Sequence, residues 1–454
     1  MLSDATDKAI SERLAKYARF GVNLSLERIQ RLLAALGHPH RQVPIIHVAG
    51  TNGKGSVCAY LSSVLTQAGY RVGRYTSPHL VSWCERICLN EQPIESAALD
   101  HTLAQVEATI PDLSAAGREI PTQFEVFTAA AWLFFAQQAV DIAVIEVGLG
   151  GRLDATNVVD APLVTVITSL SREHWQRLGP TLADIAGEKA GILKSHRPAI
   201  VGPLPADAEA VVLARAAAVD CPVVRPTPAR VDAEGWAIYV NKSTQSTLQY
   251  RLSLAGEHQR VNSAIAIAAL QTLRDQGWQI SDRHIQSGLA QARWPGRLQW
   301  LNWSAPNGQS YPWLIDGAHN PAAATVLRHY LDDLQQPEGS LSEATLLKPA
   351  SMPQVIPTST IWLMGMLSTK DHADVLRALL KPGDRLHLVP VPGHASMPPA
   401  DLQAIALTVC PELANCMTYE TLAAGLQGAI ADGDGLKVLC GSLYLVGHFF
   451  RTQF

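Results

Sequence analysis

The chain has 454 residues, of which 47% are hydrophobic and 17% are charged, and its formal net charge at pH 7 is −4. A chain of this length predicts about two to four domains with hydrophobic cores of ordinary size. The weakly acidic balance excludes a surface that as a whole attracts nucleic acid or an acidic membrane. We therefore expect no nucleic-acid partner and no membrane partner, and any anionic ligand must be bound by local cations.

The seven cysteines are scattered and form no C-x-x-C pair, which is typical of a protein from a reducing compartment. Cys84 and Cys88 are interpreted as core thiols rather than metal ligands. Residues 1–20 are charged and helical in character, without an apolar signal core, and no run approaches the roughly 20 apolar residues of a membrane helix. These features predict a cytoplasmic location.

Buried strands and helices alternate through the first part of the chain. Residues 43–49, VPIIHVA, form an apolar run typical of a buried strand, and residues 53–68 carry their apolar side chains on one helical face. Thr181 and Asp184 have the spacing of a capping box, which predicts the start of a helix. Further strands are predicted near 71–77, 141–147, 161–170 and 198–203, and a further helix over 124–138. This alternation indicates a mainly parallel sheet with both faces covered.

A second strand–helix series follows a turn at WPGRLQW, residues 294–300. Before it, residues 222–255 predict a few antiparallel strands, and residues 261–273 predict a helix. After it, residues 312–321 predict a strand that leads into a helix with Asn320 as N-cap and Pro321 at N1. Further elements are a polar surface loop over 335–360 and strands near 360–367, 384–391 and 436–445. We place two domains, at 1–296 and 297–454.

The stretch GTNGKGS, residues 50–56, differs from the usual phosphate-binding loop G-x-x-x-x-G-K-[ST]. Val48 stands where that pattern has its first glycine, and Gly55 separates Lys54 from Ser56. A glycine-rich turn between a strand and a helix points backbone N–H groups at an anion over the helix N-terminus. The strand, the helix and the lysine together favour phosphate binding over a tight turn with a solvated lysine.

Three polar side chains follow other predicted strands of the same sheet. Ser77, Glu146 and His174 each come at or just after the carboxyl end of a strand, and these ends share one edge of a parallel sheet. Oxygen and imidazole ligands suit a divalent cation, with water completing the shell. Taken singly, Glu146 is also compatible with a paired carboxylate and His174 with a core or surface histidine.

Seven motifs together resemble folylpolyglutamate synthase, within the Mur ligase superfamily of ATP-dependent amide-forming ligases. They are GTNGKGS, YTSPHLVSWCERI, EVGLGGRLDATN, EKAGI, WPGRLQ, DGAHNP and CGSLYLVG, and the match extends in this order from about residue 20 to residue 450. The resemblance implies an α/β fold. Its first domain is a P-loop-type ATPase with a mainly parallel sheet that also binds the pterin, and its second is a smaller Rossmann-like α/β domain for glutamate ligation.

The resemblance also assigns roles to matching positions. Catalytic roles fall to Lys54, Glu146, His174 and Lys189. Magnesium ligands are Ser77, Glu146 and His174, with K⁺ as a further cation. Contacts to ATP are Thr51, Asn52, Gly53, Lys54, Gly55, Ser56, Asn262, Arg297, Asp316 and His319. Lys189 is expected to be carbamylated to N6-carboxylysine, and the alternative is an ordinary salt-bridged lysine beside Glu188.

Family members that also act on dihydropteroate bind the pterin through three segments. The matching residues here are Asn23, Leu24, Ser25 and Leu26, then Thr122 and Phe124, then Leu153, Asp154 and Ala155. Asn23 and Ser25 depart from the D-L-G-L-E-R pattern of bifunctional bacterial enzymes. Glu173 replaces the aspartate that usually precedes the matching histidine, which lengthens the arm beside His174.

The resemblance implies an enzyme that uses ATP to add L-glutamate to dihydropteroate and to the glutamate tail of reduced folates through an acyl phosphate, and a monomer. One alternative is a monofunctional folylpolyglutamate synthase. A cell-wall Mur ligase is disfavoured by Gly55 and by the short segment before the loop. A P-loop switch is disfavoured because G-K-[ST] is interrupted, and a non-catalytic scaffold because Lys54, Glu146 and Arg297 are all retained.

Overall fold

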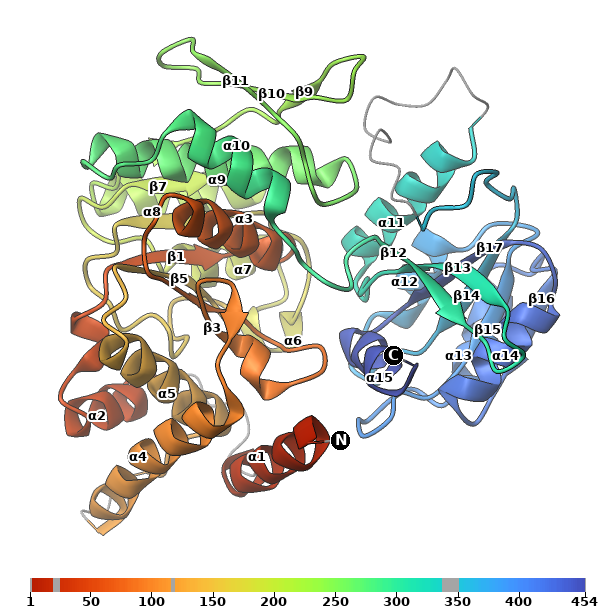
Figure 1. The fold of residues 1–454 in the computed structure, drawn as a ribbon, viewed down its shortest axis with the longest axis horizontal. Coiled ribbons are helices and arrows are strands. Elements are labelled where there is room, and N and C mark those ends of the chain that lie inside the picture. Colours follow the sequence, from red (N-terminus) through yellow and green to blue (C-terminus); the bar gives the residue numbers. More distant parts are fainter. Residues whose placement is uncertain (1, 19–24, 116–118, 337–350, 454) are drawn as a thin grey trace. The chain divides into compact units, whose positions relative to one another are not determined.

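The computed structural model describes residues 2–18, 25–115, 119–336 and 351–453. These residues form two compact units (Figure 1). The first comprises Met1–Arg230, Ala237–Arg251 and Arg260–Ala292, and the second comprises Val231–Trp236, Leu252–Gln259 and Arg293–Phe454. The chain thus passes into the second unit for the last time at Arg293.

The first unit is built on an eight-stranded sheet in the order β4-β3-β2-β5-β1-β6-β7-β8. The six strands from β2 to β8 in this order pair in parallel, and β3 and β4 form an antiparallel edge. The strands are β1 (Ile45–Ala49), β2 (Val72–Tyr75), β3 (Ile87–Leu89), β4 (Gln92–Pro93), β5 (Ile142–Glu146), β6 (Val164–Ile167), β7 (Ala199–Val201) and β8 (Val223–Val224). Every residue of β1, β2, β5 and β6 is buried, as expected for parallel strands covered on both faces.

Helices cover this sheet on both sides (Figure 1). On one face α2, α4 and α5 enclose a core that contains Ile45, Tyr75 and Ile145. Helix α3 contacts β1, β2 and β5 and packs against α10. The helices are α1 (Leu2–Ala18), α2 (Glu27–Ala35), α3 (Lys54–Gln67), α4 (Ser96–Ala115), α5 (Gln123–Gln137), α6 (Trp175–Leu178), α7 (Leu182–Ala190), α8 (Ala206–Ala218), α9 (His258–Asp275) and α10 (Asp282–Gln291). A separate sheet has the order β11-β10-β9, from β9 (Arg230–Val231), β10 (Ala237–Val240) and β11 (Thr247–Tyr250).

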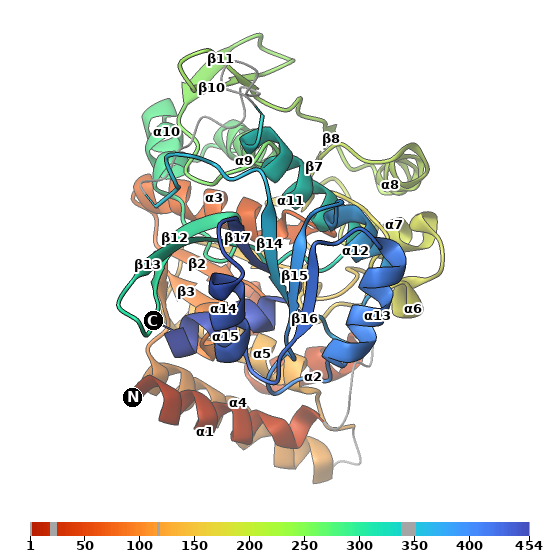
Figure 2. The same cartoon turned by 90° about the vertical axis from the view of Figure 1, so that its right-hand side faces the viewer.

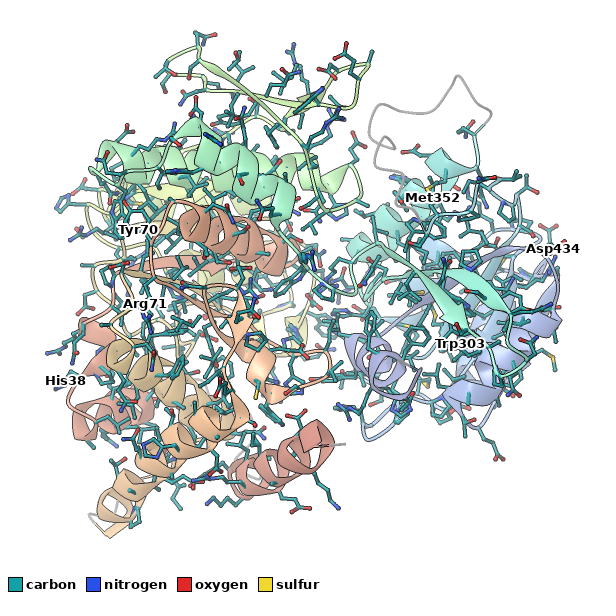
Figure 3. All side chains as sticks on the ribbon, viewed as in Figure 1. His38, Tyr70, Arg71, Trp303, Met352 and Asp434 are labelled. Carbon is teal, nitrogen blue, oxygen red and sulfur yellow. The ribbon has the colours of Figure 1, made fainter. Side chains whose placement is uncertain are left out.

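The second unit contains a six-stranded sheet in the order β12-β13-β17-β14-β15-β16, visible in Figure 2. Only β12 is antiparallel to its neighbour. Trp303 of β12, labelled in Figure 3, packs edge-on against Trp313 of β13. The strands are β12 (Gln299–Ser304), β13 (Ser310–Ile315), β14 (Thr360–Met364), β15 (Arg385–Leu388), β16 (Asn415–Thr418) and β17 (Leu436–Cys440). The helices are α11 (Pro321–Leu334), α12 (His372–Leu379), α13 (Pro399–Val409), α14 (Leu422–Ala431) and α15 (Leu443–Gln453).

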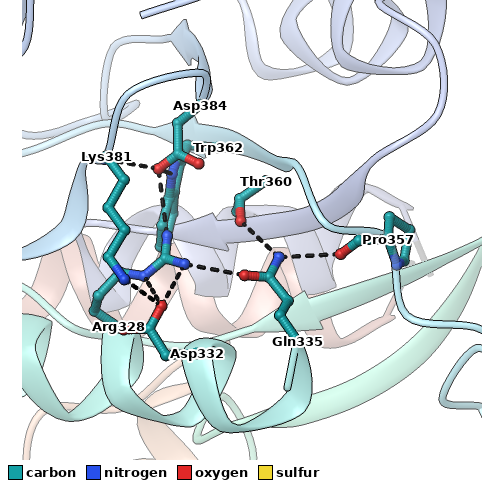
Figure 4. A network of polar contacts seen from close by, with 8 residues as sticks. All are labelled: Arg328, Asp332, Gln335, Pro357, Thr360, Trp362, Lys381 and Asp384. Atoms are coloured by element: carbon teal, nitrogen blue, oxygen red, sulfur yellow. Dashed lines mark hydrogen bonds and ion pairs between the residues drawn. The ribbon is translucent and has the colours of Figure 1, made fainter. Parts of the chain in front are cut away.

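An ion-pair network around the buried Arg328 and Asp384 ties α11 to the sheet of the second unit (Figure 4). Arg328 donates to Asp332 at 2.6 Å and to Asp384 at 3.3 Å. Asp384 also accepts hydrogen bonds from the Trp362 indole at 3.0 Å and from the backbone of Lys381 at 3.0 Å. The Lys381 ammonium contacts Asp332 at 2.7 Å. Each charge in the network therefore faces an opposite charge, which offsets the cost of removing it from water.

The α/β fold class is confirmed, and so are the capping box of Thr181 and the Asn320 cap followed by Pro321. The strand predicted over 436–445 is too long: β17 ends at Cys440, because Gly441 adopts φ +97° and α15 begins at Leu443. Residues 337–350 of the predicted surface loop lie outside the described residues. Cys84 and Cys88 are buried thiols, as expected. In the described parts of the chain, no helix combines the length and the apolar character needed to cross a membrane.

Candidate functional site

The phosphate-loop candidate lies at the carboxyl edge of the first sheet. β1 pairs with β5 on one side and with β6 on the other, and β2 lies beyond β5. The loop Gly50–Gly53 leaves β1 and enters α3, so the segments that follow β2, β5 and β6 share its edge. This is where doubly wound sheets bind ligands.

Two glycines give this loop its shape. Gly53 adopts φ +83°, and a Cβ there would lie 2.5 Å from Asn262 Oδ1. Gly50 adopts φ +151°, and a Cβ there would overlap the Thr168 hydroxyl. Both positions therefore exclude a side chain for conformational and for steric reasons. The loop also brings Asn262, predicted from a distant helix, next to the predicted residues 51–56.

Hydrogen bonds fix the loop to the segment after β6. The Thr51 N–H donates to Ser169 O at 2.7 Å, and the Thr168 hydroxyl donates to Asn52 O at 2.7 Å. The Thr51 hydroxyl donates to Ser171 O at 3.2 Å. Because both sides of the loop are held, its backbone is preorganised for an anion at the start of α3.

Two lysines converge on one carbonyl of the loop. Lys54 Nζ donates to Gly50 O at 3.1 Å and to Thr51 O at 3.1 Å, and Lys189 Nζ from α7 donates to Gly50 O at 2.8 Å. Lys189 is buried. Its burial, with a further contribution from the charge of Lys54, lowers the pKa of Lys189 to about 7. A substantial fraction of this amine is therefore neutral, and so nucleophilic, at neutral pH.

The residues predicted to bind a divalent cation are only partly brought together. Glu146 ends β5, is buried, and accepts the Ser77 N–H at 3.2 Å. His174 has φ +53°, is half exposed, and lies 3.9 Å from a carboxylate oxygen of Glu173. Across the described ranges, no three His, Cys, Asp or Glu side chains are arranged to hold a metal ion. The predicted set contains only two residues of these types, because its third member is a serine. The buried carboxylate of Glu146 and the partly buried hydroxyl of Ser77 are oxygen ligands that suit a hard divalent ion.

Two of the three predicted pterin segments adjoin each other. Thr122 caps α5, and the ring of Phe124 fills the space that a Cβ on Gly148 would occupy. Gly148 begins the loop that contains Leu153 and Ala155. In the remaining segment, Asn23 and Leu24 lie outside the described residues, whereas Ser25 caps the backbone of Glu27 at 3.2 Å and Leu26 packs against the core.

Asp154 has a structural function within its loop. It is buried and accepts hydrogen bonds from Leu149 N at 2.8 Å, Thr156 N at 3.0 Å and the Thr156 hydroxyl at 2.6 Å. Burial raises the pKa of Asp154, and these hydrogen bonds oppose the shift. Thr156 also contacts His47 of β1 at 2.8 Å, and burial lowers the pKa of that histidine to about 3. The loop after β5 is therefore tied to the central strand.

A buried ion pair that we did not predict supports the same region. Arg28 of α2 donates to Glu125 of α5 at 3.1 Å, and Glu125 also accepts the Thr122 N–H at 2.7 Å. Both side chains are buried. The pair links the end of the first pterin segment to the second. The sequence indicated this ion pair only by an arginine and a glutamate on helix faces that otherwise carry apolar core residues.

In the second unit, Asp316 and Arg297 are neighbours. Asp316 is buried after β13 and accepts Leu298 N at 2.8 Å and Ala318 N at 2.7 Å. Burial raises the pKa of Asp316, and the charge of Arg297 opposes this. His319 contacts Gly317 O at 2.7 Å. Asp316 therefore fixes the turn that presents Arg297 and His319.

Comparison with known proteins yields two family matches. Residues 48–270 match the Mur ligase middle domain, and residues 299–452 match the C-terminal domain of dihydrofolate synthetase. The folylpolyglutamate synthase of Lacticaseibacillus casei is 35% identical over 94% of this chain and 93% of its own length. The dihydrofolate synthase/folylpolyglutamate synthase of Escherichia coli is 33% identical, with 95% and 92% covered. A crystal structure of a bifunctional folylpolyglutamate synthase/dihydrofolate synthase with Mn, AMPPNP and L-glutamate bound superposes with a TM-score of 0.78, at 30% identity and with 97% of each chain covered.

Proposed function

The chain belongs to the folylpolyglutamate synthase and dihydrofolate synthase family of Mur ligases, and we propose that it ligates L-glutamate both to dihydropteroate and to the glutamate tail of reduced folates. It is an ATP-dependent ligase. The observation that carries the proposal is the preorganised loop after β1, where Lys54 and Lys189 converge on Gly50 O.

A carboxylate must be activated before an amine can displace its oxygen. A carboxylate oxygen attacks the γ-phosphorus of ATP, the bond to the β–γ bridging oxygen breaks, and ADP leaves. The glutamate amine then attacks the carbonyl carbon of the acyl phosphate. The C–O bond to phosphate breaks, inorganic phosphate leaves, and the amine loses a proton as the amide forms.

The obstacle to the first step is repulsion between two anions. Two unit charges about 4 Å apart repel by about 4 kcal/mol at an effective dielectric near 20. Lys54 and the N–H groups at the start of α3 are the groups of the first unit that offset this term. We assign phosphate contacts to Thr51–Ser56, with Lys54 as the principal cation.

Glu146 and Ser77, together with His174, are the proposed ligands of Mg²⁺. The Mn-bound relative supports the use of a divalent metal by this family. When bound, the ion supplies positive charge to the phosphate oxygens as a Lewis acid. K⁺ is retained as a proposal for a second cation.

Lys189 is the proposed site of carbamylation. A carbamate forms when a neutral amine attacks CO₂, and the lowered pKa of Lys189 makes this form available at neutral pH. The product is an anion in place of a cation. Labelled bicarbonate should give a carbamate NMR signal in the wild type that Lys189→Met lacks, and bicarbonate should raise the activity of the wild type alone. A fully active enzyme without that signal would exclude the modification.

Two sets of ligand contacts remain proposals. The contacts to ATP are assigned to Asn262, Arg297, Asp316 and His319, and the contacts to the acceptor are assigned to Asn23–Leu26, Thr122, Phe124 and Leu153–Ala155. So do the division of labour between residues 1–296 and 297–454 and a monomeric enzyme. Sedimentation tests the last of these. For the contact residues, alanine variants, and Ala155→Gly at the position that is already alanine, should raise KM for one substrate class only, according to the ligand assigned to each residue.

The decisive experiment measures phosphate release from purified protein with ATP, Mg²⁺ and L-glutamate. We expect release with dihydropteroate and, separately, with tetrahydrofolate. Release with tetrahydrofolate alone would favour a monofunctional folylpolyglutamate synthase, like the named Lacticaseibacillus relative. Release with neither acceptor would overturn the proposal.

A further inference from the structure

The backbone of the turn that follows β2 is held by several hydrogen bonds to one carboxylate. The Glu85 carboxylate accepts three backbone N–H groups, from Leu80 at 2.8 Å, Val81 at 2.9 Å and Ser82 at 2.7 Å. Ser82 reciprocates as the N-cap of the short helix Trp83–Arg86. Such reciprocal capping fixes the backbone of this turn, and therefore the position from which Arg86 extends.

Arg86 lies against two aromatic rings that contact each other, and a histidine accepts a hydrogen bond from one edge of its guanidinium. Its guanidinium carbon lies 4.4 Å from the ring centre of Trp83 and 5.7 Å from that of Phe127. Its Nε donates to His79 Nδ1 at 2.9 Å, and the His79 ring lies 4.7 Å from that of Trp83. Stacking engages the faces of a guanidinium, whereas its hydrogen bonds leave in the plane. The arrangement therefore sets the plane in which Arg86 donates.

The same turn lies between two parts of the proposed site. The Thr76 N–H donates to Arg86 O at 3.1 Å, and the next residue, Ser77, donates to Glu146. On the other side, Tyr75 contacts Phe124 at 6.3 Å between ring centres and Phe127 at 6.4 Å. Arg86 thus belongs to a segment that connects the proposed metal ligands to the proposed pterin residue Phe124.

The N-terminal helix α1 holds this turn from outside. Asp7 accepts the Ser82 hydroxyl at 2.8 Å and the Trp83 N–H at 3.2 Å, and Ser11 accepts the Trp83 indole N–H at 2.8 Å. The orientation of Trp83 therefore depends on α1. Through the stacking contact, the orientation of Arg86 depends on it as well.

We propose that Arg86 binds the carboxylate of the folate glutamate tail that does not react, and that Trp83 is its positioning residue. This inference rests on the proposed function. A cation paired with the reacting carboxylate would stabilise the ground state and oppose its attack on phosphorus. A cation that orients a second carboxylate carries no such penalty. Dihydropteroate has only the carboxylate that reacts, so Arg86 would distinguish the two acceptors.

The test compares Arg86→Gln with the wild type on both acceptors. We expect KM for tetrahydrofolate to rise about 10- to 100-fold, as for loss of a charged hydrogen-bonded pair. KM for dihydropteroate and for ATP should change less than about twofold. With a tetrahydrofolate analogue whose glutamate α-carboxylate is an amide, wild type and variant should bind equally. The inference is overturned if Arg86→Gln raises KM equally for both acceptors. It is also overturned if the variant still binds the amide analogue more weakly than tetrahydrofolate.

Two further variants separate positioning from folding. Trp83→Ala should raise KM for tetrahydrofolate selectively, and Trp83→Phe, which keeps an aromatic face, should restore most of the affinity. The matched control is Trp278→Phe, because Trp278 packs edge-on against Tyr70, with 4.9 Å between ring centres, in the same unit but outside this turn. If Trp83→Ala left both KM values unchanged, the positioning role would be wrong. A wild type inactive on both acceptors would instead reject the proposed function.

Discussion

Clusters of cations around a buried member are arranged in opposite ways in the two units, with Arg328 buried in the second and Lys189 in the first. In the second unit, Arg328 and Lys381 face Asp332 and Asp384, so positive and negative charges alternate. In the first unit, Lys54 and Lys189 converge on one neutral carbonyl. The first arrangement stabilises the fold, and the second concentrates positive charge where an anionic substrate is expected.

The pKa shifts reflect this difference. Burial works to raise the pKa of Asp332, but hydrogen bonds from Lys381 and Arg328 outweigh it and lower the pKa below its usual value. For Lys189, burial and the charge of Lys54 act in the same direction and lower the pKa to about 7. In the paired network the charged form of Asp332 is therefore stabilised, although burial raises the pKa of Asp384, whereas the loop destabilises the charged form of Lys189. Substitutions in the two regions should separate stability from activity.

The largest effect is expected at the paired network. Asp384→Ala leaves Arg328 and the Trp362 indole without this acceptor, and loss of one partner of a buried pair costs about 3–5 kcal/mol. Urea unfolding followed by tryptophan fluorescence measures the loss. Asp384→Asn retains an acceptor and should lose less. A loss below about 1 kcal/mol for the alanine variant would show that the network does not support the fold.

Lys54→Ala should reduce activity and leave the stability of the fold nearly unchanged. Turnover should fall about 10²- to 10³-fold, because a cation that stabilises the transferring phosphoryl group is lost. The free energy of unfolding should change by less than about 0.5 kcal/mol. Lys242→Ala, at an exposed position, is the matched control and should leave both quantities unchanged. Near-normal turnover in Lys54→Ala would contradict the role assigned to this lysine.

The free energy of unfolding is expected to depend on pH through Lys189. Its folded pKa of about 7 lies below the ordinary lysine pKa of 10.5, so between these values the unfolded chain holds more protons at this site. The free energy of unfolding should therefore rise with pH in this interval, by at most about 1.4 kcal/mol per pH unit. Lys189→Met should lack this contribution in bicarbonate-free buffer between pH 7 and pH 9. Identical pH slopes in both proteins would contradict the shift.

The smallest effect is expected at the rim of the paired network. The Lys381 side chain is 51% exposed, and exposed pairs contribute about 0–1 kcal/mol. Lys381→Ala should therefore reduce the free energy of unfolding by no more than about 1 kcal/mol, measured by the same urea titration. A loss comparable to that of Asp384→Ala would mean that exposure is a poor guide to energy in this network.

The sequence was informative where local pattern decides the structure. The α/β class, the glycine loop between strand and helix, and the Thr181 and Asn320 caps are all confirmed. Each depends on periodicity or on residues a few positions apart. Parallel topology also follows from strand–helix alternation, because a crossover helix returns the chain to the same end of the sheet.

What the sequence could not predict depends on contacts between distant segments. The burial of Lys189 arises because α7 packs beneath the loop after β1, and the motif EKAGI alone is equally compatible with a solvated lysine. The position of the Arg86 guanidinium depends on Phe127 from α5, and the orientation of the Trp83 ring depends on Ser11 from α1. No local periodicity encodes such pairings.

The contact between His47 and Thr156 has a consequence for how the enzyme responds to acidity. With a pKa of about 3, His47 stays uncharged from mild acid to alkali, so the contact between β1 and Thr156 keeps the same protons over this range. The attachment of the loop to β1 at this contact is therefore independent of pH. Any acid sensitivity in catalysis should originate in other groups, of which the buried Asp154 carboxyl, whose pKa is raised, and the Lys189 amine are the first to examine.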